Sequence, residues 1–304
     1  MSIDFKGRVA IVTGAGGGLG RQHALALAAR GARVLVNDLG GAVDGAGGST
    51  GAAQAVVDEI RAAGGEALAN AASVTDFAAV QAMARQAVDA WGRIDILVNN
   101  AGILRDKSFA KMALDDFRLV MDVHLMGAVH CTKAVWSLMA EQKYGRIVMT
   151  TSSSGLYGNF GQANYGAAKM ALVGLMQTLS IEGEKNNIRV NCLAPTAATR
   201  MTEGLMPEAV LQALKPEAVV PAMLVLASSD APNRTILCAG AGTFEAAHIT
   251  LTHGAWIGTD AQAPERLAAR LAEVTARFDE SVPQSGSAQG TNEVSHAMAN
   301  AVKA

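Results

Sequence analysis

Aromatic residues and cysteines are scarce in this sequence, and it has no excess of positive charge. Only 4% of the residues are aromatic, cysteine occurs three times, and 25 Lys and Arg are balanced by 27 Asp and Glu, giving a formal net charge of −2. A nucleic-acid or anionic-membrane partner usually requires a basic face, so this charge balance argues against both. Cys131, Cys192 and Cys238 show neither CxxC nor metal-ligand spacing. We expect them to be small buried residues in a reducing compartment.

Long apolar runs and targeting segments are also missing. No apolar stretch reaches about 18 residues without a charge or a turn residue, which predicts no membrane span. The start, MSIDFKGRVAIVTG, places charge where a secretory signal would be apolar, and the end, ANAVKA, is not a peroxisomal tripeptide. We therefore expect a cytoplasmic protein. Metal binding is unsupported, because His248 and His253 lack a carboxylate or cysteine partner in motif spacing.

What the sequence does contain is a regular alternation of two patterns. Half of its residues are apolar, and short β-branched runs alternate with helical stretches. The patterns predict strands at 8–14, 33–40, 66–70, 94–102, 145–153 and 188–195, and helices at 21–31, 52–63, 76–90, 115–142 and 163–185. Strands that alternate with helices of about 10–15 residues indicate a parallel sheet with helices on both faces. The predicted fold class is α/β, a doubly wound, Rossmann-type parallel sheet.

The C-terminal part departs from this alternation. We expect one more strand within 244–258, a helix at 264–278 and a meandering or partly disordered arm at 281–294. The chain would then form one domain over 1–258. A C-terminal extension over 259–304 would follow, either packed on the domain or partly disordered.

Two internal segments each have two interpretations. The glycine-rich segment 40–51 is either a cover for a ligand or a mobile surface loop. The apolar segment 201–225, with several methionines, is either a substrate lid that adapts to varied chains or an ordinary packed helix pair.

A glycine cluster follows the first predicted strand. In TGAGGGLG (13–20), Gly14, Gly18 and Gly20 would let a backbone approach a pyrophosphate where a helix start offers free N–H groups. Asp38 closes the second strand, near the distance expected for a carboxylate that binds a ribose 2′-hydroxyl. Such a carboxylate would repel the 2′-phosphate of NADP, so NAD is the predicted cofactor. The alternative is that Asp38 is a turn residue bonded to its own backbone.

Two of the three tyrosines lie in SSSGLYGNFGQANYGAAK (152–169). Tyr165 precedes Lys169 by four residues, so both lie on one face of a helix. Ser152 ends a predicted strand, and ligands of doubly wound sheets bind beyond the carboxyl ends of the strands. All three side chains could therefore face a nicotinamide. The alternative is a half-buried tyrosine over the stem of a lysine.

Together these segments resemble the short-chain dehydrogenase/reductase family. The match comprises TGAGGGLG, NNAG (99–102), Ser152, YGAAK (165–169) and NCLAP (191–195), in order and at the family's spacing. The resemblance implies hydride transfer between a carbinol carbon and nicotinamide. Tyr165 would be the general base or acid, Lys169 would lower the pKa of Tyr165 and hold the nicotinamide ribose, and Ser152 would bind the substrate oxygen. It also implies that cofactor contacts come from Gly14, Gly18, Leu19, Gly20, Asp38, Ser73, Val74, Asn100, Ala101, Gly102, Tyr165, Lys169, Pro195 and Thr199.

Two positions depart from the family pattern. His124, in VHLMG (123–127), stands where the family usually has an Asn. Its imidazole would either polarise a water that returns protons to Lys169, or be a core-facing helix residue. In PTAAT (195–199), Thr196 replaces a glycine that the family often has, while Thr199 can still hydrogen-bond the pyrophosphate.

Longer stretches, among them NNAGILRDKSFAKM and FDESVPQS, resemble the (3R)-hydroxyacyl-CoA dehydrogenase branch of this family. The resemblance implies NAD-dependent oxidation of a fatty or steroid side-chain (3R)-hydroxyacyl-CoA in β-oxidation, by a stand-alone homodimer or homotetramer paired through 115–142 and 163–185. The alternative is a 3-oxoacyl thioester reductase or a hydroxysteroid dehydrogenase. A non-catalytic dinucleotide-binding protein is disfavoured by the intact Ser152, Tyr165 and Lys169, and a serine hydrolase by the lack of a GxSxG elbow.

Overall fold

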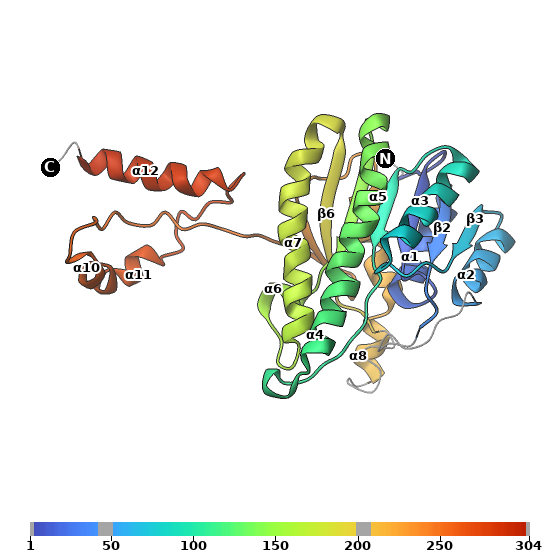
Figure 1. The fold of residues 1–304 in the computed structure, drawn as a ribbon, viewed down its shortest axis with the longest axis horizontal. Coiled ribbons are helices and arrows are strands. Elements are labelled where there is room, and N and C mark those ends of the chain that lie inside the picture. The colour runs from blue at the N-terminus through green and yellow to red at the C-terminus, as the bar shows by residue number, and fades with distance from the viewer. Residues whose placement is uncertain (1–2, 42–50, 199–207, 302–304) are drawn as a thin grey trace. The chain divides into compact units, whose positions relative to one another are not determined.

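The alternation of strands and helices forms an eight-stranded sheet in the order β3-β2-β1-β4-β5-β6-β7-β8 (Figure 1). The structure, a computed structural model, describes residues 3–41, 51–198 and 208–301. Strands β1 to β7 pair in parallel with their neighbours. The strands are β1 (Val9–Thr13), β2 (Arg33–Asn37), β3 (Ala67–Asn70), β4 (Ile96–Asn99), β5 (Gly145–Thr150), β6 (Ile188–Pro195), β7 (Ile236–Gly240) and β8 (Thr243–Ala247). The predicted doubly wound α/β fold is confirmed.

The central strands are buried along their whole length, because helices cover both faces of the sheet. Every residue of β1, β4 and β5 is buried, which explains their continuous apolar runs. On one face lie α3 (Phe77–Trp91), α5 (Gly127–Gln142) and α7 (Ala163–Gly183), and on the other α1 (Gly18–Ala29), α2 (Gly51–Ala62) and α9 (Val220–Ala227). The strand order reverses between β1 and β4, and crevices for ligands open at such a point.

The predicted helix over 115–142 contains an irregularity. It consists of α4 (Leu114–Met121), a π-helical turn over Asp122–Met126, and α5. Single π-helical turns occur often at functional sites, and this one carries His124. The remaining short helices of this part of the chain are α6 (Ser153–Tyr157), α8 (Glu208–Ala213) and 3₁₀ turns at Phe109–Lys111, Glu184–Asn186 and Pro216–Val219.

The two segments with open interpretations are described only in part. Residues 42–50 of the glycine-rich segment and 199–207 of the apolar segment lie outside the described residues. The end of the apolar segment forms α9, whose Met223, Leu226 and Ala227 are completely buried in the main core. The end of the segment is therefore a packed core helix.

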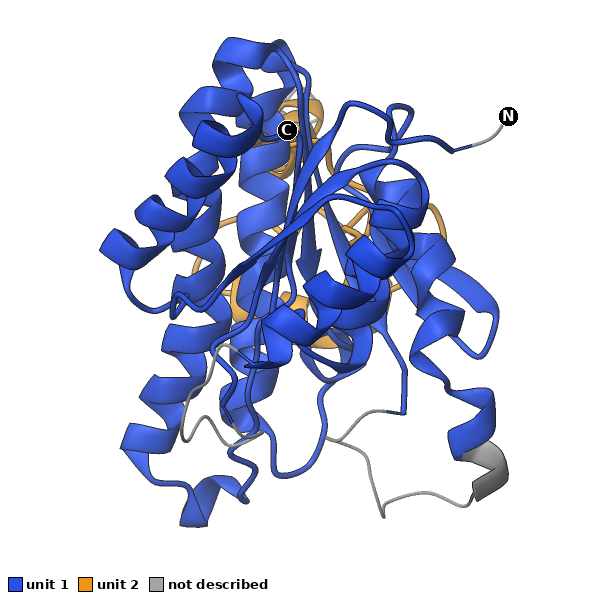
Figure 2. Ribbon diagram, turned by 90° about the vertical axis from the view of Figure 1, so that its right-hand side faces the viewer, with its two compact units in different colours: residues 1–246 blue, residues 247–304 orange. Residues whose placement is uncertain are grey.

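The chain divides into two compact units, 1–246 and 247–304 (Figure 2), where we had expected a boundary at 258. The expected strand within 244–258 coincides with β8 only at its start. The second unit contains α10 (Ala263–Ala269), α11 (Leu271–Val274) and α12 (Ser287–Ala301). The prediction of a meandering or partly disordered arm at 281–294 is wrong from Ser287 onward. Pro283 and Gly286 precede the helix, and the residues after them are mostly compatible with it.

A network of charges lies at the amino ends of the strands. The fully buried carboxylate of Asp95 accepts hydrogen bonds from Arg8, Arg93 and the backbone N–H of Val9, at 2.6–3.0 Å. The guanidinium of Arg146, which is 1% exposed, donates to the backbone carbonyls of Gly145, Asn187, Ser228 and Ser229 at 2.7–2.9 Å. Every charge in this network therefore has a partner.

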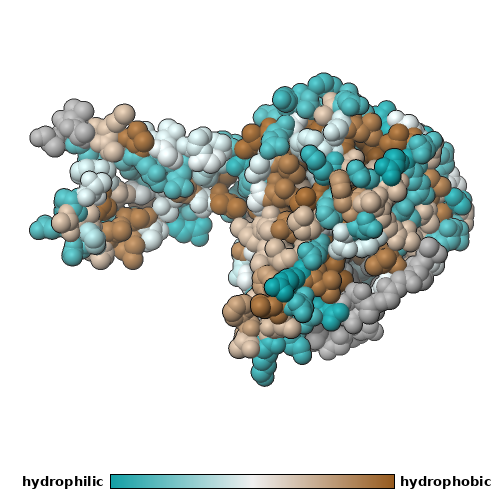
Figure 3. All heavy atoms as spheres, in the orientation of Figure 1, coloured by the Kyte–Doolittle hydropathy of each residue, from teal (hydrophilic) through white to brown (hydrophobic). Residues whose placement is uncertain are grey.

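The surface shows apolar side chains along α4 and α7 (Figure 3). Leu114 of α4, Met126 of the π-helical turn, and Met170 and Ile181 of α7 are 39–69% exposed. Among the described residues, no helix is both long and apolar enough to cross a membrane. Cys131 and Cys192 are buried as expected, but Cys238 is only half-buried, because it lies on β7 near the edge of the sheet.

Candidate active site

One cavity of about 620 Å³ opens at the carboxyl ends of the strands. Its walls come from the loops after β1, β2, β3, β4, β5 and β6 and from α7. Thr199 lies outside the described residues. The other predicted site residues all line this cavity: Gly14, Gly18, Leu19, Gly20, Asp38, Ser73, Val74, Asn100, Ala101, Gly102, His124, Ser152, Tyr165, Lys169 and Pro195.

The glycine turn (13–20) forms one wall of the cavity, and its glycines carry no side chains that would cover the backbone there. Gly14 and Gly18 have φ of 62° and 51°, in the left-handed region that favours glycine. A Cβ on Gly20 would lie 2.2 Å from the carbonyl oxygen of Gly14, so only glycine fits there. No side chain caps the start of α1, whose first-turn N–H groups therefore remain available. These features fit a dinucleotide pyrophosphate.

The NNAG segment holds the glycine turn in place. The amide nitrogen of Asn100 donates to the carbonyl oxygens of Thr13 and Gly14, both at 3.0 Å. The backbone N–H groups of Asn100 and Ala101 donate to the hydroxyl of Thr13 at 3.0 and 3.1 Å. The Asn100 side chain thus acts within the protein as a brace between the loops after β1 and β4.

Asp38 lies at the edge of the cavity, where β2 ends. One of its carboxylate oxygens accepts from the N–H of Gly16 and the other from the N–H of Gly40, both at 2.7 Å. The second bond is the local turn that the alternative interpretation expected, and the first connects Asp38 to the glycine turn. Each oxygen keeps acceptor capacity for a hydroxyl group.

Ser152 and Tyr165 face each other across the cavity. Ser152 caps α6, its hydroxyl accepting from the N–H of Ser154 at 3.1 Å, and it also hydrogen-bonds the Tyr165 phenol. We had expected the pKa of Tyr165 to be lowered. In the protein it is raised, because burial disfavours the phenolate more strongly than the Ser152 hydrogen bond favours it. The charge of Asp106 raises it further.

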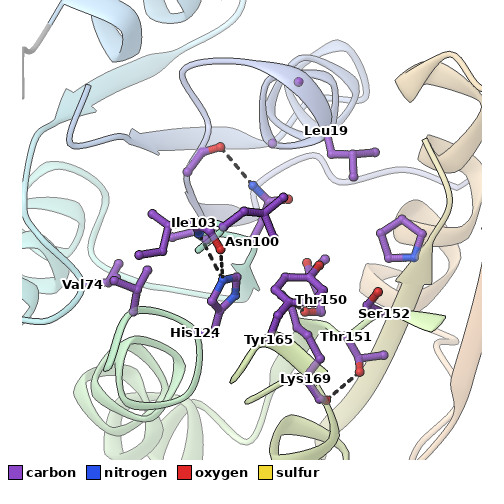
Figure 4. A pocket seen from close by; sticks show the side chains of 18 of the residues that line it. Leu19, Val74, Asn100, Ile103, His124, Thr150, Thr151, Ser152, Tyr165 and Lys169 are labelled. Carbon is purple, nitrogen blue, oxygen red and sulfur yellow. Dashed lines mark hydrogen bonds between the residues drawn. The ribbon is translucent and has the colours of Figure 1, made fainter. Parts of the chain in front are cut away.

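Lys169 is buried beneath Tyr165, one helical turn further along α7 (Figure 4). Its ammonium donates to the carbonyl oxygen of Thr150 at 2.6 Å and lies 5.5 Å from the centroid of the Tyr165 ring. Burial lowers the pKa of Lys169 to about 7. Near neutral pH both the ammonium and the amine form of Lys169 are therefore populated.

His124 is a buried side chain with one unpartnered nitrogen. Its Nε2 lies 2.8 Å from the carbonyl oxygen and 3.0 Å from the backbone nitrogen of Ile103, and its ring meets Tyr165 edge to face at 5.1 Å. Burial, and then the charge of Lys169, lower its pKa to about 3. The imidazole is thus neutral at physiological pH, and its Nδ1 has no partner among the described residues.

A small void of about 10 Å³ lies behind the main cavity. Its lining includes Thr13, Asn99, His124 and Lys169, and both Asn99 Oδ1 and His124 Nδ1 are buried without a partner among the described residues. A void of this size with several polar partners is the minimum that holds one water. His124 is thus packed in the core, as one interpretation expected, and it lines the same small void as Lys169. Its role in a proton relay stays a prediction.

Sequence analysis missed several residues that line the cavity. Thr150 ends β5, Thr151 follows it, and Thr196 follows β6. Because ligands of such sheets bind at the carboxyl ends of the strands, these positions could have been predicted. Gln162 precedes Tyr165 by three residues, a helical spacing that was also visible. Asp106 carried no local signal, because only the folding of its loop against α7 brings it to the site.

Comparison with known proteins supports this site. The family model described as short chain dehydrogenase matches residues 8–209. The chain is 52% identical over 254 residues to peroxisomal multifunctional enzyme type 2 of Drosophila melanogaster, covering 83% of this chain and 42% of that protein. The solved structure of the full-length Drosophila enzyme aligns over 97% of this chain and 50% of its own, with a TM-score of 0.80 and 38% identity. The chain thus spans about half the length of this relative or less.

Two further relatives are similar over nearly their whole length. A short-chain type dehydrogenase/reductase of Mycobacterium tuberculosis is 48% identical over 269 residues, 88% of this chain and 94% of that protein. A structure of 7α-hydroxysteroid dehydrogenase complexed with NADH and 7-oxo glycochenodeoxycholic acid is 30% identical, with a TM-score of 0.71, over 79% of this chain and 95% of that one. The chain belongs to the short-chain dehydrogenase family and is an oxidoreductase that acts on CH–OH groups with a nicotinamide dinucleotide.

Proposed function

We propose that this protein oxidises a (3R)-hydroxyacyl-CoA to the 3-oxoacyl-CoA with NAD. The observation that carries the proposal is that Ser152, Tyr165 and Lys169 share one cavity with the glycine turn. The similarity to peroxisomal multifunctional enzyme type 2 supports the thioester substrate. A hydroxysteroid is the second candidate, favoured by the similarity to 7α-hydroxysteroid dehydrogenase.

In this proposal Ser152 and Tyr165 bind the substrate hydroxyl together. Ser152 donates a hydrogen bond to the carbinol oxygen and fixes its position, while Tyr165 as phenolate removes the proton. The bound dinucleotide supplies the hydride acceptor and a positive charge on its nicotinamide ring. Because burial raises the pKa of Tyr165, the phenolate needs neighbouring positive charge, and Lys169 in its ammonium form provides it.

Lys169 and His124 have separate roles in returning the proton to solvent. With a pKa of about 7, Lys169 both stabilises the phenolate and exchanges a proton. His124 stays neutral, so it acts as a hydrogen-bond partner of a water near Lys169 and does not itself change charge. The ring also fixes the segment after β4 through Ile103.

The preference for NAD over NADP is proposed from Asp38. Its carboxylate is held at the cavity edge by two backbone N–H groups, where a ribose 2′-hydroxyl can donate to it. A 2′-phosphate at the same place would meet a like charge.

We also propose that the protein is a homodimer or homotetramer. The exposed apolar side chains on α4 and α7, such as Leu114 and Ile181, would be covered by the same helices of a second copy (Figure 3). Sedimentation equilibrium would measure the mass, and a monomer at micromolar concentration would contradict this. A cytoplasmic location stays a prediction, because relatives named peroxisomal occupy another compartment, and cell fractionation would test it.

The experiment that tests the function is NADH formation with NAD and a panel of alcohols. The panel contains (3R)- and (3S)-hydroxyacyl-CoAs of increasing chain length, a steroid side-chain thioester and free hydroxysteroids. We expect turnover confined to the 3R thioesters. Turnover of free hydroxysteroids alone would replace this function by the second candidate. If the protein binds NADH but turns over none of these alcohols, both candidate functions are contradicted.

A further inference from the structure

Gln162 lines the same cavity as Tyr165, the tyrosine proposed as the general base. It is the residue immediately before α7 and lies three residues before Tyr165, at the start of the helix that carries the tyrosine. Both line the cavity, together with Asp106, Ser154 and Asn159. The electrostatic effect of Asp106 on Tyr165 is independent support that this group of residues adjoins the reacting end.

Three hydrogen bonds orient the Gln162 amide. Its oxygen accepts from the Ser154 hydroxyl at 2.8 Å and from the Asn159 amide nitrogen at 3.1 Å. Its nitrogen donates to a carboxylate oxygen of Asp106 at 2.6 Å. An ionised carboxylate can only accept hydrogen bonds, so the atom of the Gln162 amide that contacts Asp106 must be the nitrogen.

These bonds leave Gln162 with one unused hydrogen-bonding group. Both acceptor positions of its oxygen are occupied, and one of the two hydrogens on its nitrogen goes to Asp106. Among the described residues, the second hydrogen has no partner. One N–H donor thus remains on a residue that lines the cavity, and a half-buried donor gains from an acceptor in the ligand.

The substrate class that fits has a second acceptor close to its hydroxyl carbon. In a 3-hydroxyacyl thioester the carbonyl carbon lies two bonds, or about 2.5 Å, from the carbinol carbon. With the hydroxyl on Ser152 and Tyr165, its carbonyl oxygen comes within reach of a donor one helical turn earlier. A simple secondary alcohol or a ring hydroxyl has no acceptor at this place.

We propose that Gln162 binds the thioester carbonyl oxygen of the substrate and so selects 3-hydroxyacyl thioesters. Asp106 and Ser154 are positioning residues that hold the nitrogen and the oxygen of its amide. The inference rests on the proposed function, of which it specifies the substrate recognition.

The test compares two substrates in two proteins. One substrate is a (3R)-hydroxyacyl-CoA, and the other is its thioether analogue, in which the carbonyl is a methylene group. We expect the wild type to prefer the thioester in kcat/KM by about tenfold or more, since the analogue leaves the Gln162 donor unpaired. In Gln162→Met, which keeps the length but lacks the N–H, this preference should fall to within about threefold. NADH affinity should be unchanged.

Asn159→Ala is the matched control, because Asn159 bonds only the amide oxygen and leaves the donor in place. It should retain the thioester preference. An undiminished preference in Gln162→Met, an equal loss of activity on both substrates, or the same loss of preference in Asn159→Ala would overturn the inference and leave the function standing. A wild type that turns over neither compound but still binds NADH would overturn both.

Discussion

Buried polar groups have hydrogen-bond partners at the amino end of the sheet, whereas several at the carboxyl end have none among the described residues. At the amino end, Asp95 and Arg146 are buried, and their charges are paired with side chains or backbone carbonyls. At the carboxyl end, Asn99 Oδ1, His124 Nδ1 and Thr150 Oγ1 are buried without a partner among the described residues. A buried polar atom without a partner is unfavourable, and these three belong to residues that line the cavity or the void behind it, where a ligand or water can bind. The amino end therefore contributes stability, and the carboxyl end carries the groups proposed to act in function.

The largest effect should come from Tyr165→Phe at the carboxyl end. Removing the hydroxyl abolishes the general base, so turnover should fall about 10²–10⁴-fold. The phenyl ring still packs against His124, so the melting temperature and NADH affinity should change little. Initial rates, NADH fluorescence and thermal unfolding measure the three quantities. Wild-type turnover in this variant would remove Tyr165 from the mechanism.

At the amino end, Asp95→Ala should affect stability and not the chemistry. It removes the carboxylate shared by Arg8, Arg93 and the backbone of Val9, and we expect a loss of about 3–4 kcal/mol in the free energy of unfolding. Urea unfolding measures it. Asp115→Asn, in an exposed ion pair with Arg118, is the control and should change stability by less than about 0.5 kcal/mol. Equal effects of the two variants would contradict the role of the amino end.

The free energy of unfolding, measured at a series of pH values, tests another buried group, His23 in α1. Both nitrogens of its ring lack a partner among the described residues. Burial lowers its pKa from 6.5 to about 4. Between these values only the unfolded chain takes up the proton, so stability is lost as pH falls. We expect a loss of about 2 kcal/mol from this group between pH 7 and 5. His23→Leu should remove this part of the slope in unfolding experiments, and an unchanged slope would refute it.

The smallest effect should come from Asp38→Ala at the edge of the cavity. The ribose contact is lost and the like charge near a 2′-phosphate disappears, so the ratio of kcat/KM for NAD to that for NADP should fall about tenfold. Steady-state kinetics with both cofactors measure the ratio. An unchanged preference would show that Asp38 serves only the turn with Gly40.

Local sequence patterns were sufficient to predict much of the fold and many residues of the site. The apolar runs of β1 and β5 and the glycine turn identified strands and a helix start, because periodicity and backbone sterics act within a few residues. The spacing of Tyr165 and Lys169 likewise required only a helix. Strand β7 and helix α12 were not predicted, because ILCAG contains only one β-branched residue and SAQGTNEVSHAMANA is too polar to stand out by pattern.

The fold class, the family and most of the residues that line the cavity could be predicted from the sequence alone. The pKa values of the site could not, because they depend on the tertiary structure. The raised pKa of Tyr165, the pKa of about 7 of Lys169 and the neutral state of His124 all follow from burial. The bond of Asp106 to Gln162 joins residues 56 apart. Desolvation and long-range contacts depend on how distant segments pack, and no local pattern encodes them.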